Sequence, residues 1–215
     1  MASKSRPPLG RDAWAAVALD ALAAGGLRAV AVEPLAAALG ATKGSFYWHF
    51  SNREALLVAA LERWERQHTD AVVARVEQEP TVERRLRYLF SAVVGAATGD
   101  RVELALLASS DHPVVGPTLR RVTERRIAYV AALFERLGFP PTEARRRSLI
   151  AYTTYLGHAQ LAHTVPGLLP TTKPQRRTHL DEVMVALTGR KPAAASPASR
   201  GRKKRADRPT KRGRS

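Results

Sequence analysis

The chain has 215 residues, enough for one large domain or two small ones with a sizeable buried core. It contains no cysteine, which excludes disulfides, thiolate zinc sites and cysteine nucleophiles. The formal net charge is +16, no apolar run reaches the roughly 18 residues of a membrane span, and no signal peptide is visible, so we expect a cytoplasmic protein.

The first residues predict an arm followed by a helix. Pro7 and Pro8 favour an extended arm over residues 1–10, which is either a frayed terminus or a segment that touches phosphate. From 11 to 24 apolar residues recur at helical spacing, and Gly25-Gly26 then ends the helix. Trp14 belongs to this apolar stripe, so we expect it in the core.

A second helix is predicted between 32 and 39, where apolar residues again recur at helical spacing. Gly40 follows at the place where a left-handed residue ends a helix. Glu33 and Pro34 suit the first turn of this helix, whereas Ala31 offers no hydroxyl cap.

The stretch 42–50 predicts a short polar helix. Thr42 can cap its start, and the run Ser51-Asn52-Arg53-Glu54 fits a capping box that begins the next helix. A supporting helix, a turn at Gly40-Ala41 and a short second helix are the parts of a helix-turn-helix.

The first turn of such a second helix enters the major groove of DNA. Lys43 suits the O6 and N7 acceptors of guanine, and Ser45 is permissive. Gly44 lets the backbone come close to the bases. These three residues are therefore the predicted base readers.

The run from Val17 to Leu57 resembles the DNA-binding domain of the tetracycline-repressor (TetR) family of transcriptional regulators. The resemblance rests on Leu35-Ala36, Leu39-Gly40, Gly44, Tyr47-Trp48-His49-Phe50 and Leu56-Leu57. It implies an all-α protein: a three-helix DNA-binding domain with a helix-turn-helix, residues 11–55, precedes a larger helical ligand-binding and dimerisation domain, residues 56–188. Glu33 departs from the pattern, since the family often has a DNA-contacting basic residue there.

The resemblance implies further DNA contacts outside the first turn. Tyr47 and His49 would reach phosphates, and Thr42 and Arg53 are placed to do the same. Trp48 would lie either in the core or against the groove wall. The full set of predicted DNA-binding residues is Thr42, Lys43, Gly44, Ser45, Tyr47, Trp48, His49 and Arg53. Phe46 and Phe50 are predicted core residues.

The rest of the chain predicts helices throughout. A long helix opens at Ser51 and continues to about Val76, before Pro80. Five further helices are expected. The first ends near Thr98, and the second is short and spans 102–109. After breaks at 111–113 and 116–117, the others run from Leu119 to Gly138, from a Thr142 cap to Thr164, and from Pro174 to Leu187. No strand-like alternation of useful length occurs, so the fold class is all-α.

The last two of these helices are apolar on more than one face. In TetR-like proteins they form a four-helix bundle between two chains, with Gly157 as a point of close approach. We therefore expect a homodimer on a palindromic double-stranded DNA operator, with its recognition helices roughly 34 Å apart.

The second domain of this family encloses a pocket whose small-molecule effector weakens DNA binding. Aromatic and neutral polar side chains of the kind that line pockets mark the candidates. They are Trp64, His68, Phe90, His112, Tyr129, Tyr152, Tyr155, His158 and Gln160. For each of them the alternative is a place in the core or the dimer interface, and the sequence names no effector.

No metal, cofactor or catalytic site is predicted. His158 and His163 are five residues apart, so on one helix they point about 140° away from each other. No nucleophile lies beside a plausible base, and no glycine-rich phosphate loop occurs. We expect neither a cofactor nor an enzyme.

The tail, residues 189–215, carries eleven Lys or Arg residues against Asp207 alone. Its composition cannot bury enough surface to fold, so it either solubilises the protein or binds DNA nonspecifically. The leading hypothesis is a dimeric repressor released from its operator by a small-molecule effector. The alternatives are an architectural protein that binds DNA nonspecifically through this tail, and a carrier or enzyme with a vestigial helix-turn-helix.

Overall fold

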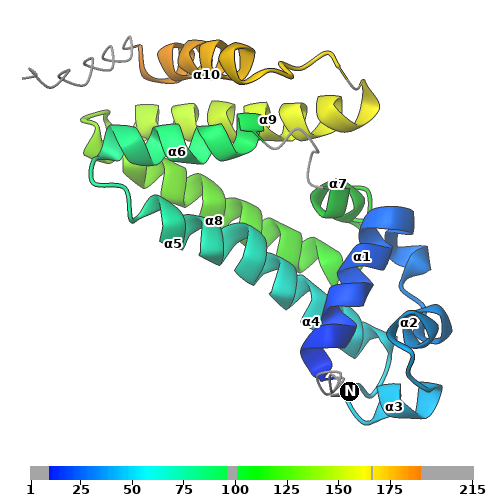
Figure 1. The fold of residues 1–215 in the computed structure, drawn as a ribbon. Coiled ribbons are helices and arrows are strands. Elements are labelled where there is room, and N and C mark those ends of the chain that lie inside the picture. Colours follow the sequence, from blue (N-terminus) through cyan, green and yellow to red (C-terminus); the bar gives the residue numbers. More distant parts are fainter. Residues whose placement is uncertain (1–9, 96–100, 166, 190–215) are drawn as a thin grey trace, which may run out of the picture.

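The computed structural model describes residues 10–95, 101–165 and 167–189. Every regular element in these ranges is a helix, which confirms the all-α prediction (Figure 1). The helices are α1 (Arg11–Ala29), α2 (Val32–Leu39), α3 (Lys43–Tyr47), α4 (Arg53–Glu65), η1 (Arg66–Asp70), α5 (Ala71–Val76), α6 (Val82–Gly95), α7 (Arg101–Leu107), α8 (Val115–Arg136), α9 (Pro141–Thr164) and α10 (Lys173–Thr188). None of the described helices is both long and apolar enough to cross a membrane.

The predicted glycines kink α1 and end α2, but α1 continues past Gly25-Gly26 to Ala29, later than predicted. α1 loses helical geometry at Gly25 and at Gly26, whose φ of 67° L side chains rarely adopt, and then makes one further turn. Gly40 closes α2 in the left-handed conformation, with φ 63° and ψ 32°. The chain therefore turns sharply between α2 and α3.

The helix α3 is shorter than predicted. Thr42 Oγ1 accepts a hydrogen bond from the Ser45 amide at 3.1 Å, as expected of a cap. The helix ends at Tyr47, and Trp48 and His49 lie in a turn instead of continuing the helix. The prediction of a single helix from 42 to 50 was therefore wrong at its C-terminal end.

The long helix predicted after Ser51 is a continuous rod made of α4, η1 and α5 (Figure 1). Its start was predicted one residue early, because the cap is Asn52, which accepts from the Ala55 amide at 2.8 Å. Its middle segment η1 is a π-helix, an irregularity that occurs often at functional sites.

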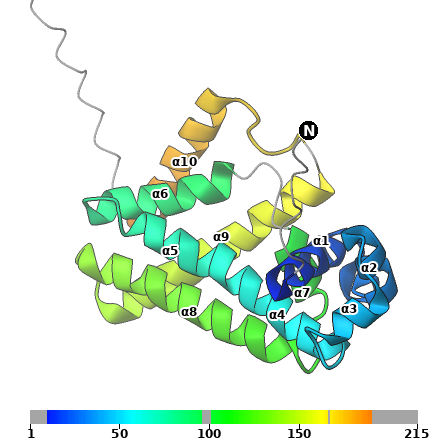
Figure 2. The same cartoon turned by 60° about the horizontal axis from the view of Figure 1, so that its bottom comes forward.

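Two hydrophobic clusters hold the helices together. The first joins α1 to α4 with α7 and the start of α8, and includes the fully buried Trp14, Phe46 and Trp64. The second joins α5, α6, α8, α9 and α10 around the buried Leu86 and Phe134. Because α8 contributes to both clusters, it connects the N-terminal helices to the rest of the molecule (Figure 2).

Two other boundaries differ from the prediction. Gly116-Pro117, expected to break the chain before a helix, lie in the first turn of α8. Proline is tolerated there because the first amides of a helix have no intrahelical partner. Thr142 does not cap α9, which begins at Pro141 after the extended Pro140.

The C-terminal helix α10 agrees with the prediction to within one residue at each end. Thr172 and Gln175 form a capping box at its start, and Gly189 ends it with φ 66°. The predicted N-terminal arm before Gly10, the helix end near Thr98 and the basic tail after Gly189 lie outside the described residues.

Candidate nucleic-acid interface and ligand cavity

Two buried phenylalanines fix α3 on the N-terminal domain. Phe46 and Phe50 are 0% and 2% exposed, and the Phe46 ring meets the edge of Trp14 at 5.4 Å between centroids. With the inner face anchored in this way, Tyr47 and Trp48 are left at the surface. Tyr47 is 56% exposed and Trp48 is 88% exposed, so Trp48 is a surface residue and not a core residue.

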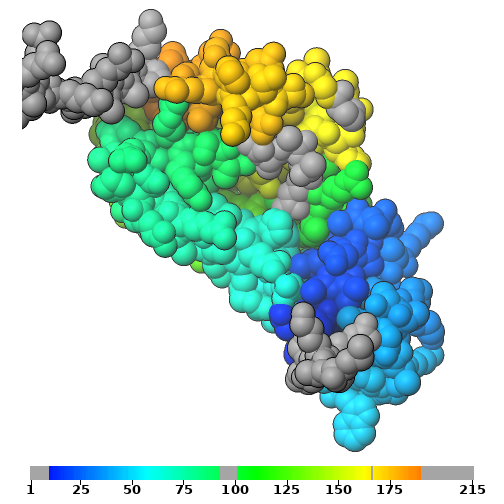
Figure 3. Space-filling view, viewed as in Figure 1, coloured from blue at the N-terminus to red at the C-terminus, as the bar shows by residue number. Residues whose placement is uncertain are grey.

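The end of the molecule that carries α3, light blue in Figure 3, projects away from the helical body. Thr42, Lys43 and Gly44 are exposed on it, and Ser45 is half-buried. A Cβ built on Gly44 would meet only Thr42 Oγ1, at an ordinary contact distance of 3.6 Å. The protein itself therefore leaves room for a side chain at Gly44.

An ion pair crosses the turn between α2 and α3. Lys43 Nζ lies 2.5 Å from Glu33 Oε1, and both side chains are more than half exposed. The hydrogen bond that Lys43 donates holds the pKa of Glu33 below its ordinary value, and the same contact raises the pKa of Lys43. The carboxylate that departs from the family pattern is thus the direct partner of the predicted guanine reader.

Arg53, predicted to touch phosphate, has a different place in the structure. Its guanidinium donates to the carbonyl oxygens of Val30 and Leu27 at 2.6 Å and 2.5 Å, and the side chain is half-buried. These bonds tie the start of α4 to the segment between α1 and α2. Arg53 therefore braces the domain from inside, which corrects the expectation of an outward-facing side chain.

Arg11 braces the other side of the turn after α3. Its guanidinium lies 4.6 Å from the centroid of the Phe50 ring and donates to the His49 carbonyl at 3.0 Å. The half-buried His49 ring meets the edge of the same Phe50. The sequence predicts only that a helix begins at Arg11 and gives no sign of these contacts.

A cavity of about 470 Å³ lies between η1, α5, α6, α8 and α9. Its wall is mainly apolar, with polar groups from η1, α8 and α9. The lining residues are Gln67, His68, Thr69, Val72, Val73, Leu89, Phe90, Ala92, Arg125, Arg126, Tyr129, Val130, Ala151, Tyr152, Tyr155 and Ala159. Its volume is within the range of cavities that hold small molecules.

Five of the predicted pocket residues line this cavity: His68, Phe90, Tyr129, Tyr152 and Tyr155. The other four were wrongly placed there, each for a visible reason. Trp64 is fully buried in the first hydrophobic cluster, and Gln160 is exposed on α9. His112 lies in a separate depression near the start of α8, and His158 contacts His179 of α10, with 2.8 Å between their Nε2 atoms.

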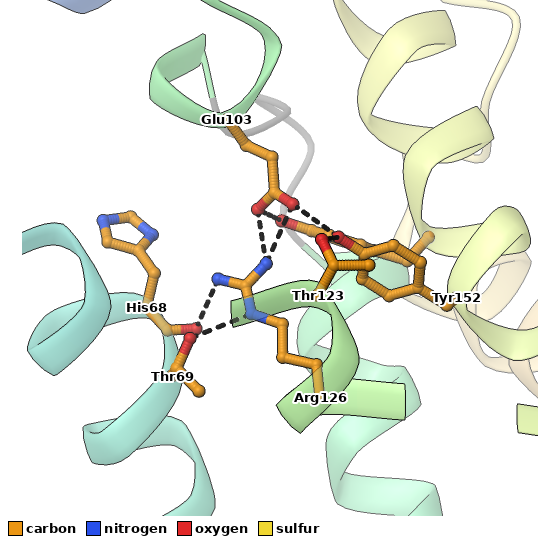
Figure 4. A network of polar contacts seen from close by, with 7 residues as sticks. His68, Thr69, Glu103, Thr123, Arg126 and Tyr152 are labelled. Carbon is orange, nitrogen blue, oxygen red and sulfur yellow. Dashed lines mark hydrogen bonds and ion pairs between the residues drawn. The ribbon is translucent and has the colours of Figure 1, made fainter. Parts of the chain in front are cut away.

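A buried carboxylate accepts hydrogen bonds from three polar residues that line the cavity (Figure 4). Glu103 of α7 is 0% exposed, and Arg126 of α8 donates from one nitrogen to both of its oxygens, at 2.8 Å and 2.6 Å. The Tyr152 and Tyr155 hydroxyls donate to the same carboxylate at 3.0 Å and 2.8 Å. Burial lowers the pKa of Arg126, but the attraction and hydrogen bonding of Glu103 together with the neighbouring Tyr155 and Tyr152 outweigh this effect, and the net shift is upward.

The other side of Arg126 holds the π-helical segment. Its Nε donates to Thr69 Oγ1 at 2.9 Å and a terminal nitrogen donates to the His68 carbonyl at 3.1 Å, as Figure 4 shows. Arg126 also lies over the Trp64 ring, 5.0 Å from its centroid. One guanidinium therefore joins the α4–η1 rod to α7, and α7 packs against α1 of the N-terminal domain.

The described residues hold no group of three or more side chains suited to a metal ion. What they do hold is a helix-turn-helix with an exposed, capped first turn, attached through a rod to a helical body with a cavity. This combination is typical of DNA-binding regulators of transcription.

Comparison with known families finds one match in the N-terminal part of the chain. Residues 15–60 match the model for bacterial regulatory proteins of the tetR family. This match agrees with the sequence resemblance to the TetR family over the predicted DNA-binding domain. A comparison with curated proteins gives no match.

Solved structures share the fold over nearly the whole chain. A TetR-family transcriptional regulator from Streptomyces coelicolor superposes with a TM-score of 0.68 at 18% identity, over 85% of this chain and 92% of the other. The fatty acid degradation regulator FadR from Bacillus halodurans gives 0.65 at 16% identity, over 86% and 97%. The multidrug binding protein EbrR, complexed with imidazole, gives 0.55 at 24% identity, over 89% and 99%.

Proposed function

We propose that this protein is a homodimeric repressor that binds a palindromic operator and leaves it when a small molecule fills the cavity. The observation that carries the DNA-binding part is the exposure of Lys43, Gly44 and Tyr47 beside the buried anchor Phe46. In this proposal residues 11–55 form the DNA-binding domain and residues 56–188 the regulatory and dimerisation domain. The protein acts in the cytoplasm and uses no cofactor or catalytic group.

The proposed contacts divide into base readers and phosphate contacts. Lys43 leaves Glu33 to donate to guanine in the major groove, and Gly44 and Ser45 line the closest approach. Thr42, Tyr47, Trp48 and His49 contact the sugar-phosphate backbone on either side and hold the register. Arg53 supports these contacts by bracing α4 and makes none itself.

The proposed dimer interface is the outer face of α9 and α10. Leu149 and Ile150 are 42% and 56% exposed, and Val185 on α10 is 37% exposed. Gly157 lies about two turns beyond Ile150 along α9 and has open space where a side chain would be. Two-fold symmetry through this face would place two α3 helices for one operator.

Effector release follows from linkage. A small molecule that binds better to the conformation with mis-spaced α3 helices weakens DNA binding, and DNA weakens its binding by the same factor. The cavity supports this proposal because it lies along the rod that carries α3. EbrR, whose fold the chain shares, is named as a multidrug binding protein, which agrees with a ligand site in such a body.

Selection of bound duplexes from a random pool tests the DNA-binding proposal. We expect the full chain, at about physiological salt where nonspecific binding is weak, to enrich one palindrome. Lys43→Ala should lose the preference for guanine at one position of each half-site, and truncation after Gly189 should weaken binding without changing the sequence. Loss of all binding on truncation would instead favour the architectural alternative.

Light scattering tests the dimer. Ile150→Glu should give a monomer that binds the selected palindrome at least about tenfold more weakly, because half-sites then bind one at a time. Val58→Glu is the matched control, since Val58 is 39% exposed on α4 and outside the proposed interface. A wild-type protein that is monomeric at micromolar concentration would contradict the proposal.

A further inference from the structure

Both arginines that line the cavity are paired with carboxylates. Arg126 is paired with Glu103 as described above, and Arg125 lies 3.2 Å from Glu65 and 2.7 Å from Asp70. Arg121 completes the set through Glu65, at 2.6 Å. Within this network of ion pairs, three guanidiniums therefore balance three carboxylates.

This balance leaves no countercharge for a charged ligand. A carboxylate that entered would have to displace Glu103, which has no exposed surface and accepts from Arg126, Tyr152 and Tyr155. An ammonium would enter next to two guanidiniums. Burying a charge without a partner is strongly unfavourable, so either kind of ligand would bind poorly.

The cavity wall combines apolar and polar side chains. Val72, Val73, Leu89, Phe90 and Val130 supply an apolar wall from α5, α6 and α8. Tyr129 adds only its ring, because its hydroxyl donates to Glu77 at 2.8 Å. The polar lining side chains belong to η1, to α9 and to the two arginines of α8, Arg125 and Arg126.

We propose that the cavity binds an uncharged, mainly apolar molecule that carries a hydrogen-bonding group. The inference rests on the proposed function of the cavity as the effector site, and it names the chemical class of the effector. The apolar body lies against the valines and Phe90, and the hydrogen-bonding group lies towards Arg126 and the tyrosines. Each methylene buried in this way strengthens binding about fourfold.

A matched series of ten-carbon chains tests the class. The full chain is titrated calorimetrically at pH 7.4 with 1-decanol, decanoate and decylammonium, all below micelle-forming concentrations. We expect 1-decanol to bind at least about tenfold more tightly than either ion. We also expect 1-octanol to bind about fifteenfold more weakly than 1-decanol, since two methylenes are lost.

Three variants locate the site. Ala92→Trp, at an exposed position of the cavity wall, should weaken 1-decanol binding, whereas Ala128→Trp, exposed on α8 outside the lining, should not. Glu103→Gln leaves Arg126 without its countercharge, so the ratio of decanoate to 1-decanol affinity should rise at least about tenfold.

The outcomes separate the ligand class from the proposed function. Equal or tighter binding of decanoate or decylammonium to the wild-type chain, or no binding of 1-decanol, would overturn the inference of a neutral ligand. If 1-decanol binds as expected but leaves the affinity for the selected palindrome unchanged, the ligand class stands and effector release fails.

Discussion

Lys43 on α3 and Glu33 on α2 form an ion pair across the turn of the helix-turn-helix, with 2.5 Å between Nζ and Oε1. The pair lies on the outer side of the domain, and both side chains are exposed. It cancels one positive charge at the place where the protein would meet polyanionic DNA. Because phosphate attraction dominates the affinity of DNA-binding proteins, this cancellation has a measurable cost.

We predict that Glu33→Gln tightens operator binding about fivefold, because it frees Lys43 and removes a carboxylate from the interface. The dissociation constant of the selected duplex, measured by fluorescence anisotropy, checks this. Glu135→Gln, an exposed carboxylate near the end of α8, is the control and should change nothing. In a Lys43→Ala background the gain should largely vanish. A gain that persists there would mean that Glu33 acts on DNA directly and not through Lys43.

Gly44 gives a test that separates DNA approach from folding. A methyl group at this position meets only Thr42 Oγ1 at 3.6 Å, and alanine favours a helix over glycine by about 1 kcal/mol. Gly44→Ala should therefore unfold at the same temperature as the wild type or higher. Its dissociation constant for the operator should nonetheless rise about tenfold or more. The added methyl group would keep the α3 backbone from its closest approach to the bases, where each contact contributes about 1–3 kcal/mol. Unchanged affinity would place the first turn of α3 away from the groove floor.

The features that sequence predicts well are local. Thr42 precedes a polar stretch and caps it, Gly40 follows a helical stripe and turns left-handed, and Thr172 with Gln175 forms a capping box. Each depends on residues within a few positions of one another. The same reasoning chose Ser51 over Asn52 as a cap, because both side chains can accept the bond and the choice depends on how the preceding turn is packed.

The features that sequence misses depend on distant partners. The sequence predicts that Arg53 contacts phosphate, because nothing near it in the chain shows another partner. In the fold its guanidinium donates to the Leu27 and Val30 carbonyls. Glu103 and Arg126 are 23 residues apart, and no spacing rule joins them before α7 and α8 are packed. The apolar cavity wall was missed for a related reason, since its valines and leucines have the same pattern in sequence as a filled core.

The buried pair of Glu103 and Arg126 predicts a large and specific loss of stability. Glu103→Ala leaves a largely buried guanidinium unpaired, so we expect the free energy of unfolding to fall by about 3–5 kcal/mol in urea titrations. The double variant Glu103→Leu with Arg126→Met should recover at least half of that loss, because neither charge then remains buried. Glu79→Ala, which removes a partly exposed pair with Arg84, should cost under about 1 kcal/mol. A similar cost for Glu103→Ala and Glu79→Ala would show that the buried pair contributes little.

The free energy of unfolding should depend on pH through Glu65, whose ion pair with Arg121 joins α4 to α8. Arg121 donates to this carboxylate at 2.6 Å and holds the pKa of Glu65 below its ordinary value of 4.5. A carboxylate with a lowered pKa in the folded state stabilises the fold fully above its unfolded pKa, and loses that effect as the pH falls through the folded pKa. Wild type should therefore be more stable than Glu65→Gln at pH 7.

This difference in unfolding free energy should narrow as the pH falls below 4.5 and should close once Glu65 is protonated in both states. Urea titrations of the two proteins between pH 7 and pH 3 measure it. Glu62→Gln, at an exposed position on the same helix α4, should follow the wild type at every pH. A constant gap between wild type and Glu65→Gln across this range would show that packing of the side chain, and not its charge, joins α4 to α8.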